Sequence, residues 1–174
     1  MKTITTERLV LKPMCTEYLI STHAYAADRE NSKFMAYLPN DNIEETLEYL
    51  ESAEAEFQKD SPEFYEMAVF YGDVHIGAVS LYLDESRTTC EFGWMLHRNY
   101  HGKGFATEAA LAMLKYARDE LGIRHFIATC DTENIPSRRV MEKLGMTLSE
   151  ERGGRKNKLS DEERREYLYE LCLN

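Results

Sequence analysis

The residues best suited to chemistry lie in a short glycine-bearing stretch near the middle of the chain, residues 101–106, with the sequence HGKGFA. Gly102 and Gly104 allow backbone conformations and close approaches that a side chain would block. The residues that follow, 105–121, contain neither glycine nor proline and have the apolar spacing of an amphipathic helix. Free N–H groups and the helix dipole would together make the start of this helix an anion site, best suited to phosphate.

Two familiar nucleotide motifs do not fit this stretch. The dinucleotide fingerprint needs a third glycine or a close substitute three positions after Gly104, where the chain has Thr107. A phosphate loop of the Walker type needs Ser or Thr after Gly-Lys, whereas Gly104 follows Lys103. The stretch therefore predicts a phosphate site of another kind.

The elements that position this stretch follow from apolar periodicity and turn residues. Thr16 and the residues 40–42 are cap candidates, the turn Gly72-Asp73 joins two strands, and Gly145 ends a helix. These signals predict helices at 16–27, 43–59, 105–121 and 135–144, strands at 8–12, 64–71, 75–83, 88–96, 125–131, 146–152 and 166–173, and a polar loop at 153–165. Three antiparallel strands before the phosphate stretch and its helix indicate an α+β protein with one domain, residues 1–174.

Composition narrows the class of protein. Hydrophobic residues make up 43% and charged residues 30% of the 174 residues, which is ordinary for a globular domain. No apolar run reaches the length of a membrane span, and the first ten residues lack the apolar core of a signal peptide, so we expect a cytoplasmic protein without a membrane partner. Four separated cysteines without a CxxC motif predict thiols, buried at Cys90, Cys130 and Cys172, and no metal site.

Charge is unevenly distributed along the chain. Residues 1–87 contain 7 Lys or Arg and 17 Asp or Glu, whereas residues 88–174 contain 14 of each, so the first half carries the whole net charge of −10. A nucleic-acid partner is disfavoured, because binding to the phosphate backbone needs a basic face. The acidic half is either a solvated surface or a region that attracts a cation.

Three segments resemble the GNAT superfamily of acyl-CoA N-acyltransferases. Its pyrophosphate loop has Gln or Arg, two residues, Gly, one residue, then Gly or Ala, and this pattern falls on His101, Gly104 and Ala106. Residues 134–146 are similar to the superfamily's next strand-to-helix segment, and residues 6–11 resemble its first strand in the ribosomal-protein-alanine N-acetyltransferase (Rim-type) branch. The resemblance covers most of the chain, in the expected order.

The resemblance implies both a fold and an activity. The fold would be a mixed central sheet of about six to seven strands, mostly antiparallel, flanked by about four helices. The activity would be transfer of an acetyl group from acetyl-CoA, the co-substrate, to a primary amine by direct attack, with a protein N-terminus or a cationic small amine as acceptor and a homodimer possible. The alternative is a non-catalytic module of the same fold that binds or senses acyl-CoA.

The resemblance also assigns residues to CoA binding. The backbone of the strand before the loop would pair with the pantetheine, the loop would take the pyrophosphate, and the start of the next helix would touch the pantetheine amide. By position these residues are Trp94, Met95 and Leu96 in the strand, His101, Gly102, Lys103, Gly104, Phe105 and Ala106 in the loop, and Asn134 at the helix. Asn134 is also well placed as a helix cap, and a neutral His101 offers only one donor where relatives have Gln or Arg.

Two residues are candidates for proton transfer. Glu91 lies in the strand entering the loop, where some relatives carry a catalytic base; the other interpretation is a structural or solvent-facing glutamate. Many relatives use a tyrosine as acid, but the alignment places Met141 there, which cannot donate a proton. Ser137, one turn earlier, resembles the Rim-type substitute; it is otherwise a hydroxyl at a helix start.

The acceptor side is expected along the first two helices, within residues 16–59. Six glutamates crowd the second of these helices, at positions 44, 45, 48, 51, 54 and 56. A negative wall would attract a cationic amine, and this is the reason to expect a positively charged acceptor.

Overall fold

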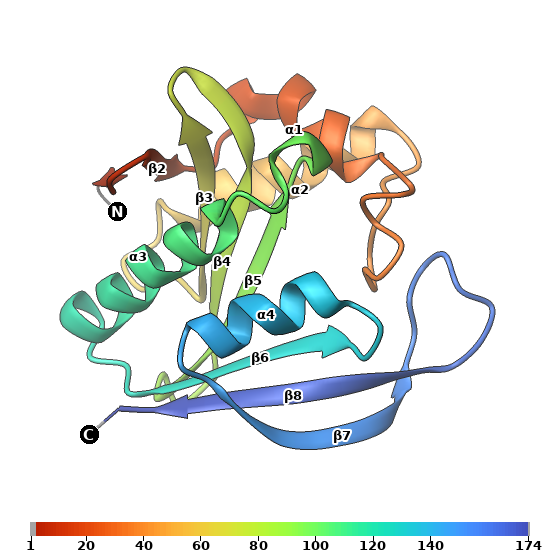
Figure 1. Cartoon of the computed structure of the whole chain (residues 1–174). Coiled ribbons are helices and arrows are strands. Elements are labelled where there is room, and N and C mark those ends of the chain that lie inside the picture. Colours follow the sequence, from red (N-terminus) through yellow and green to blue (C-terminus); the bar gives the residue numbers. More distant parts are fainter. Residues whose placement is uncertain (1–2, 174) are drawn as a thin grey trace.

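The protein is built around one open sheet of eight strands, described for residues 3–173 by a computed structural model (Figure 1). The ends of the predicted domain, residues 1, 2 and 174, lie outside the described residues. The sheet order is β1-β2-β3-β4-β5-β6-β8-β7, and only β5 and β6 are parallel neighbours. The strands are β1 (Ile4–Thr5), β2 (Leu9–Pro13), β3 (Phe64–Tyr71), β4 (Val74–Leu83), β5 (Thr89–Leu96), β6 (His125–Asp131), β7 (Thr147–Arg155) and β8 (Arg164–Cys172).

This architecture confirms the predicted α+β fold with a mixed, mostly antiparallel sheet. The sheet has eight strands where six to seven were expected, and the strand that the sequence pattern missed is β1, which has only two residues and carries no periodic pattern. The loop expected at 153–165 is shorter, since β7 continues to Arg155 and β8 begins at Arg164. Cys172 is exposed near the end of β8, contrary to the buried thiol predicted there.

Helices cover both faces of the sheet (Figure 1). They are α1 (Leu19–Ala26), α2 (Ile43–Glu56), α3 (Phe105–Glu120) and α4 (Ile135–Lys143), with single 3-10 turns η1 (Thr16–Tyr18) and η2 (Arg98–Tyr100). Alternate residues of β3 feed two apolar clusters: Met67 packs in the one that contains residues of α3 and α4, and Ala68 in the one beneath α2. The helices of each face therefore have their own core.

Helix caps were predicted with mixed success. The side chain of Asn42 accepts a hydrogen bond from the backbone N–H of Glu45 at the start of α2, as expected for a cap. Thr16 is not a cap: its hydroxyl donates to Glu54 at 2.9 Å, and α1 begins only after η1. The competing partner lies 38 residues away and could not be read from local sequence.

The feature that positions the site is a gap between β5 and β6. These strands pair only at their shared end, where the last partners are Glu91 and Ile127. Beyond that point β5 stays with β4 as far as the pair Gly77 and Leu96, while β6 stays with β8, and Figure 1 shows the two strands diverging. At Gly77 a side chain would collide with the carbonyl oxygen of Met95, so glycine is needed for β4 to follow β5 this closely.

Candidate active site

The loop before α3 has the geometry of an anion site. Gly102 and Gly104 have φ values of 73° and 81°, in the left-handed region that favours glycine. Gly104 is the N-cap of α3, and no side chain caps this helix. The first N–H groups of α3 are thus left for a ligand, and the long helix places the positive end of its dipole there. The loop is therefore suited to an anionic group such as a phosphate.

Arg8, from the start of β2, supports this loop from the side. Its Nη1 donates to the carbonyl oxygen of Lys103 at 3.0 Å, and its guanidinium lies 4.7 Å from the centre of the Phe105 ring. Its Nε donates to Glu108 at 2.7 Å, and Thr6 donates to the same carboxylate at 2.6 Å. Partial burial would raise the pKa of Glu108, but these bonds lower it below its ordinary value. Sequence reasoning used Arg8 only as part of a strand signature and missed this contact.

His101 and Lys103 each have a hydrogen-bond partner within the chain. His101 Nε2 lies 2.8 Å from the carbonyl oxygen of Leu96, which can only accept, so this nitrogen carries the proton. A neutral His101 thus ties the loop to the end of β5 and has no second N–H in its ring to offer. Lys103 Nζ donates to the carbonyl oxygen of Asn99 at 3.0 Å and stays exposed beside the loop.

Successive peptide groups of β5 point alternately towards β4 and into the gap. The carbonyl oxygen of Thr89 accepts from Asp84, and the N–H of His97 donates to Ile76, so odd-numbered residues of β5 face β4. Trp94 and Leu96 therefore direct their peptide groups into the gap. Those of Met95 point towards β4, which corrects the expectation that its backbone pairs with pantetheine.

Leu96 has only part of its backbone left for a ligand. Its carbonyl oxygen accepts from His101 and from Asn31 Nδ2 at 3.1 Å, so its N–H is the group that remains. Trp94 keeps both peptide groups on the gap, while its side chain is half-buried against the core beside Phe92.

Glu91 lies at the last paired position before the strands separate. Its carboxylate accepts a hydrogen bond from Thr129 Oγ1 of β6 at 3.2 Å. Burial raises the pKa of Glu91, and the Thr129 bond offsets part of that rise. A half-buried carboxyl with a raised pKa at the base of the gap has the properties of a general base.

Asn134 and Ser137 lie together at the start of α4. Asn134 Oδ1 accepts from the backbone N–H of Ser137 at 3.2 Å, and Pro136 occupies the first turn, so Asn134 is a helix cap as predicted. The cap uses its oxygen and leaves its NH2 to donate elsewhere. Met141 is fully buried in the core, so the place where many relatives carry a tyrosine faces away from solvent.

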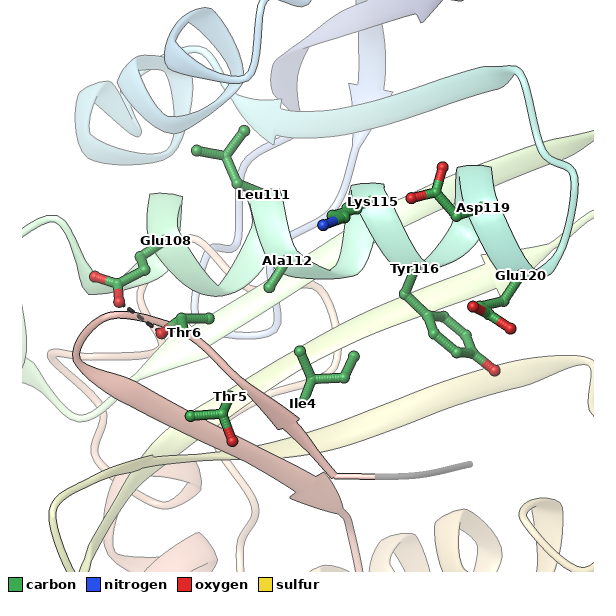
Figure 2. Close-up of a pocket in the computed structure, with 10 residues that line it drawn as sticks. All are labelled: Ile4, Thr5, Thr6, Glu108, Leu111, Ala112, Lys115, Tyr116, Asp119 and Glu120. Atoms are coloured by element: carbon green, nitrogen blue, oxygen red, sulfur yellow. Dashed lines mark hydrogen bonds between the residues drawn. The ribbon is translucent and has the colours of Figure 1, made fainter.

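Two hollows flank these residues. One of about 480 Å³ lies between β1 and α3 and ends at the bond between Thr6 and Glu108 (Figure 2). It is lined by none of the candidate site residues. Another of about 190 Å³ lies near the end of β6, lined by Lys33, Phe34, Glu133, Asn157, Ser160 and Arg164. Glu133 immediately precedes Asn134, so this second hollow adjoins the start of α4.

The glutamates of α2 are divided between exposed positions and contacts within the chain. Thr46, Leu50 and Ala53 form the buried side of the helix, and Glu44, Glu48 and Glu51 are exposed. The remaining three are bound within the chain: Glu45 accepts from the N–H of Asp41, Glu54 from Thr16 and Glu56 from the N–H of Glu63. Glu44, Glu48 and Glu51 are therefore the members of this set that face solvent.

Comparison with known proteins identifies the family. The sequence model of the acetyltransferase (GNAT) domain matches residues 8–147. The chain is 36% identical over 146 residues to a Bacillus subtilis protein described as the uncharacterized N-acetyltransferase YnaD, covering 82% of this chain and 81% of the relative. A crystal structure of a GNAT-family acetyltransferase from Bacillus anthracis has a TM-score of 0.83 and 27% identity, and the alignment covers 98% of both chains.

A further solved structure bears on the fold. RimL, an alpha-N-protein acetyltransferase of ribosomal L7/L12 solved in complex with coenzyme A, has a TM-score of 0.88 at 16% identity, covering 99% of this chain and 98% of RimL. At that identity the likeness shows the fold. With the glycine loop, the gap and the matched domain, it follows that the chain belongs to the GNAT family and is an N-acyltransferase that uses acetyl-CoA as co-substrate.

Proposed function

We propose that the acceptor is a primary amine that is positively charged in solution, either a protein N-terminus or a small cationic amine, and that its neutral form, after loss of a proton, attacks the thioester carbonyl directly. The observation that carries this proposal is the position of Glu91, a half-buried carboxyl at the base of the gap between β5 and β6. Acetyl-CoA supplies the activated acetyl group. The chain's own residues bind the co-substrate, remove a proton from the amine and stabilise the departing thiolate.

Co-substrate binding is assigned mainly to backbone groups. The N–H groups from Gly102 to Ala106 would hold the pyrophosphate, with Lys103 adding charge nearby. The peptide groups of Trp94 and the N–H of Leu96 would pair with the pantetheine, and the NH2 of Asn134 would donate to one of its carbonyls. His101 would keep the end of β5 in place through its bond to Leu96.

Glu91 is proposed as the base, and the demand on it depends on the amine. An α-amino group with a pKa near 7.7–8.0 is partly neutral at pH 7, whereas a lysine side chain near 10.4 needs roughly 4–5 kcal/mol to lose its proton there. Deprotonating an α-amino group needs less free energy than deprotonating a lysine side chain. A single carboxyl with a raised pKa is suited to this smaller demand, so a protein N-terminus fits Glu91 better as acceptor.

Ser137 is proposed as the donor to the departing sulfur. It is half-buried in the first turn of α4, and its backbone N–H is fixed by Asn134. A thiol has a pKa of only about 8.5, so a hydrogen bond from a hydroxyl suffices where full protonation is not required.

Charge and relatives support a cationic acceptor. The chain carries a net charge of −10, all within residues 1–87, and such a field concentrates cations near the protein. RimL acts on the α-amino group of a ribosomal protein according to its description, which supports a protein N-terminus for this chain too. A homodimer remains a prediction that light scattering of the purified protein would test.

An acceptor screen tests the proposal. Purified protein and acetyl-CoA would be offered a short basic peptide with a free N-terminal serine, the same peptide with a blocked N-terminus, spermidine, an aminoglycoside and free amino acids, with release of CoA as readout. Both peptides would lack lysine, so that the N-terminus is their only primary amine. We expect turnover with the free peptide or with spermidine, and none with the blocked peptide. Binding of CoA without turnover on any amine would contradict the proposal and favour the acyl-CoA-sensing alternative.

A further inference from the structure

Residues 28–41, which connect α1 to α2 and are called here the bridge segment, cross the open end of the gap between β5 and β6. At the β5 side, Asn31 Nδ2 donates to the carbonyl oxygen of Leu96 at 3.1 Å, and Asp28 pairs with Arg98 at 3.2 Å. At the other side, the segment contacts the end of β7 and the loop that follows it. It therefore joins the two halves of the sheet that the gap separates.

The far side of the bridge segment is held by two basic residues more than a hundred positions later. Arg155 Nη2 donates to the carbonyl oxygen of Phe34 at 2.8 Å. Lys158 donates through its backbone N–H to Met35 at 3.0 Å and through Nζ to the carbonyl oxygen of Pro39 at 2.8 Å. These bonds hold the bridge segment against the end of β7 and the loop that follows it.

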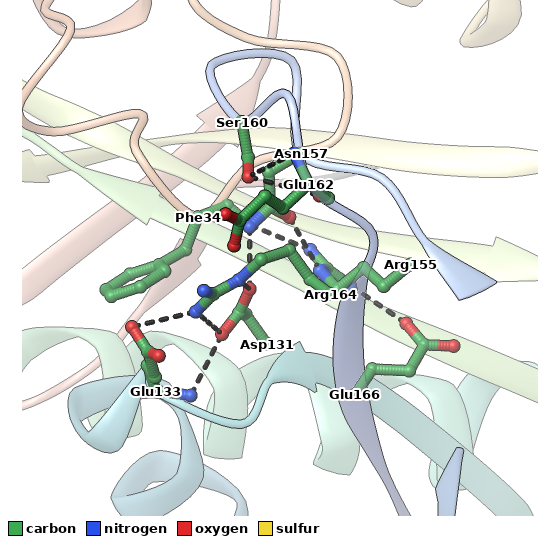
Figure 3. Close-up of polar contacts among 9 residues, drawn as sticks. All are labelled: Phe34, Asp131, Glu133, Arg155, Asn157, Ser160, Glu162, Arg164 and Glu166. Atoms are coloured by element: carbon green, nitrogen blue, oxygen red, sulfur yellow. Dashed lines mark hydrogen bonds and ion pairs between the residues drawn. The ribbon is translucent and has the colours of Figure 1, made fainter. Parts of the chain in front are cut away.

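Arg155 is the junction of this arrangement, as Figure 3 shows. Its side chain is only 12% exposed, and each guanidinium nitrogen bonds a different segment. Nε donates to Asn157 at 2.8 Å, Nη1 to Glu166 at 2.9 Å, and Nη2 to Phe34. Because the guanidinium group is planar and each of its three nitrogens has a partner, it fixes both the distance and the direction between the segments it joins. The ammonium group of a lysine could not do this.

The anchor on the sheet side is rigid. Asn157 donates to Asp131, a fully buried carboxylate at the end of β6, at 2.6 Å. Arg164 donates to both oxygens of the same carboxylate, at 3.0 and 3.1 Å. Burial would raise the pKa of Asp131, but these donors hold it below its ordinary value. Arg155 thus holds the bridge segment from a point that is fixed on β6 and β8.

We propose that Arg155 is a positioning residue for acceptor binding: through the Phe34 carbonyl it fixes the bridge segment across the open end of the gap. The inference rests on the proposed function, because it assigns the acceptor to this end of the gap. Phe34 and Lys33 from the segment, with Glu133 and Arg164 opposite, line the hollow of about 190 Å³ whose shape the bond would maintain. Arg155 acts through Phe34 and contacts neither reactant.

Arg152 provides a matched control. It donates to the other oxygen of Glu166 at 2.8 Å, yet it has no bond to the bridge segment and is 46% exposed. Both arginines lie near Glu91 and lower its pKa, so Arg152→Gln and Arg155→Gln share the loss of one charge beside that carboxyl. Only Arg155→Gln removes the tie to Phe34. Arg155→Lys keeps the charge without the fork.

The first measurement is amide hydrogen exchange over residues 33–41, which does not depend on activity. We expect exchange to rise by about tenfold in Arg155→Gln, by less in Arg155→Lys, and not at all in Arg152→Gln. If Arg155→Gln does not fold, the comparison of Arg155→Lys with Arg152→Gln decides. Equal exchange in the arginine variants and the parent would overturn the positioning role.

The second measurement is kinetic, with the best acceptor from the screen. In Arg155→Gln the KM for the acceptor should rise about tenfold more than in Arg152→Gln, with the affinity for CoA within about twofold of the parent. A matching loss of CoA affinity, or equal acceptor KM values in the two variants, would overturn the proposal. If the parent binds CoA but acetylates no amine, the proposed function fails while the exchange result still stands.

Discussion

The two ends of the candidate site are built by different means. The CoA end, residues 97–108, is made from backbone: two glycines with positive φ, an uncapped helix and the peptide groups of β5. The end at which we propose that the acceptor binds is held by long side chains, since Arg155, Lys158 and Arg164 each bond atoms in segments far away in sequence. Even Arg8, whose side chain supports this loop, does so by donating a hydrogen bond to a backbone carbonyl oxygen.

The difference follows from what each end must recognise. A pyrophosphate is the same in every acyl-CoA, and N–H groups at a helix start bind it without any particular side chain. The proposed acceptor end depends on side chains, and side chains are what substitution changes. Changes of backbone should therefore damage CoA binding most, and changes of side chain should act mainly on the acceptor and on proton transfer.

The largest effect is expected from Gly104→Asp. The variant places a side chain and a negative charge where the pyrophosphate would lie, and Gly104 has a φ of 81°. CoA affinity, measured by calorimetry, should fall at least tenfold, which is about 1.4 kcal/mol. Gly145→Asp is the control, because Gly145 has a φ of 80° and open space around it but lies at the end of α4. Equal CoA affinity in the two variants would mean that this loop is not part of the CoA site.

Glu91→Gln should lower kcat by roughly ten- to a hundredfold, because it removes the proposed base. The difference in kcat between parent and variant should grow as the pH falls from about 9 to 7, because more of the amine is then protonated. It should narrow below the raised pKa of Glu91, where the parent's carboxyl is itself protonated. Thr129→Val removes a bond that lowers this pKa, so in that variant the acid limb of kcat/KM should move to higher pH with its plateau kept. Unchanged profiles in both variants would exclude Glu91 as the base.

Ser137→Ala should lower kcat by about tenfold while changing the KM for acetyl-CoA little. Its thermal midpoint should match the parent, because the cap bond uses only the backbone of Ser137. Asn134→Ala is the comparison, since loss of that cap should cost about 1 kcal/mol of stability. A parental kcat in Ser137→Ala would mean that the thiolate departs without help from this hydroxyl.

The smallest effect is expected from Glu44→Gln with Glu48→Gln. Both residues are exposed on α2, so they can act only through a field that salt screens over about 10 Å at 0.1 M. For a cationic acceptor, kcat/KM should fall with added salt, and the double variant should reduce kcat/KM about twofold at low salt. A salt-insensitive rate would leave the acidic half as solvated surface, and a large effect would place these glutamates closer to the acceptor than we propose.

Local rules predicted much of the fold. The alternation in 64–83 around Gly72-Asp73 gave the hairpin of β3 and β4, and the caps Asn42 and Asn134 start α2 and α4. The glycine loop was equally local, since its geometry depends on φ values that glycine alone adopts readily. In each case the residues that decide the structure are neighbours in sequence.

What the sequence did not predict depends on distant partners. Arg8 meets Lys103 across 95 positions and Arg155 meets Phe34 across 121, and no spacing rule connects such pairs. The hydrogen bond between the His101 ring and the carbonyl oxygen of Leu96 was likewise not predicted, although only five positions separate the two residues. The peptide groups of Met95 were misassigned because the direction of alternation in β5 is set by its register with β4.

The sheet order also sets an order of assembly during synthesis. β6 pairs with β5 over three residues but with β8 over seven, and β8 lies between β6 and β7. While the chain is being made, β6 and β7 therefore lack their main partner until residues 164–172 have left the ribosome. The glycine loop and α3 are made by residue 120, but the core into which α3 packs also contains Phe126 of β6 and Met141 of α4. A nascent chain would thus make its coenzyme loop early, and would gain its acceptor half, with the Arg155 junction, only when β8 enters the sheet.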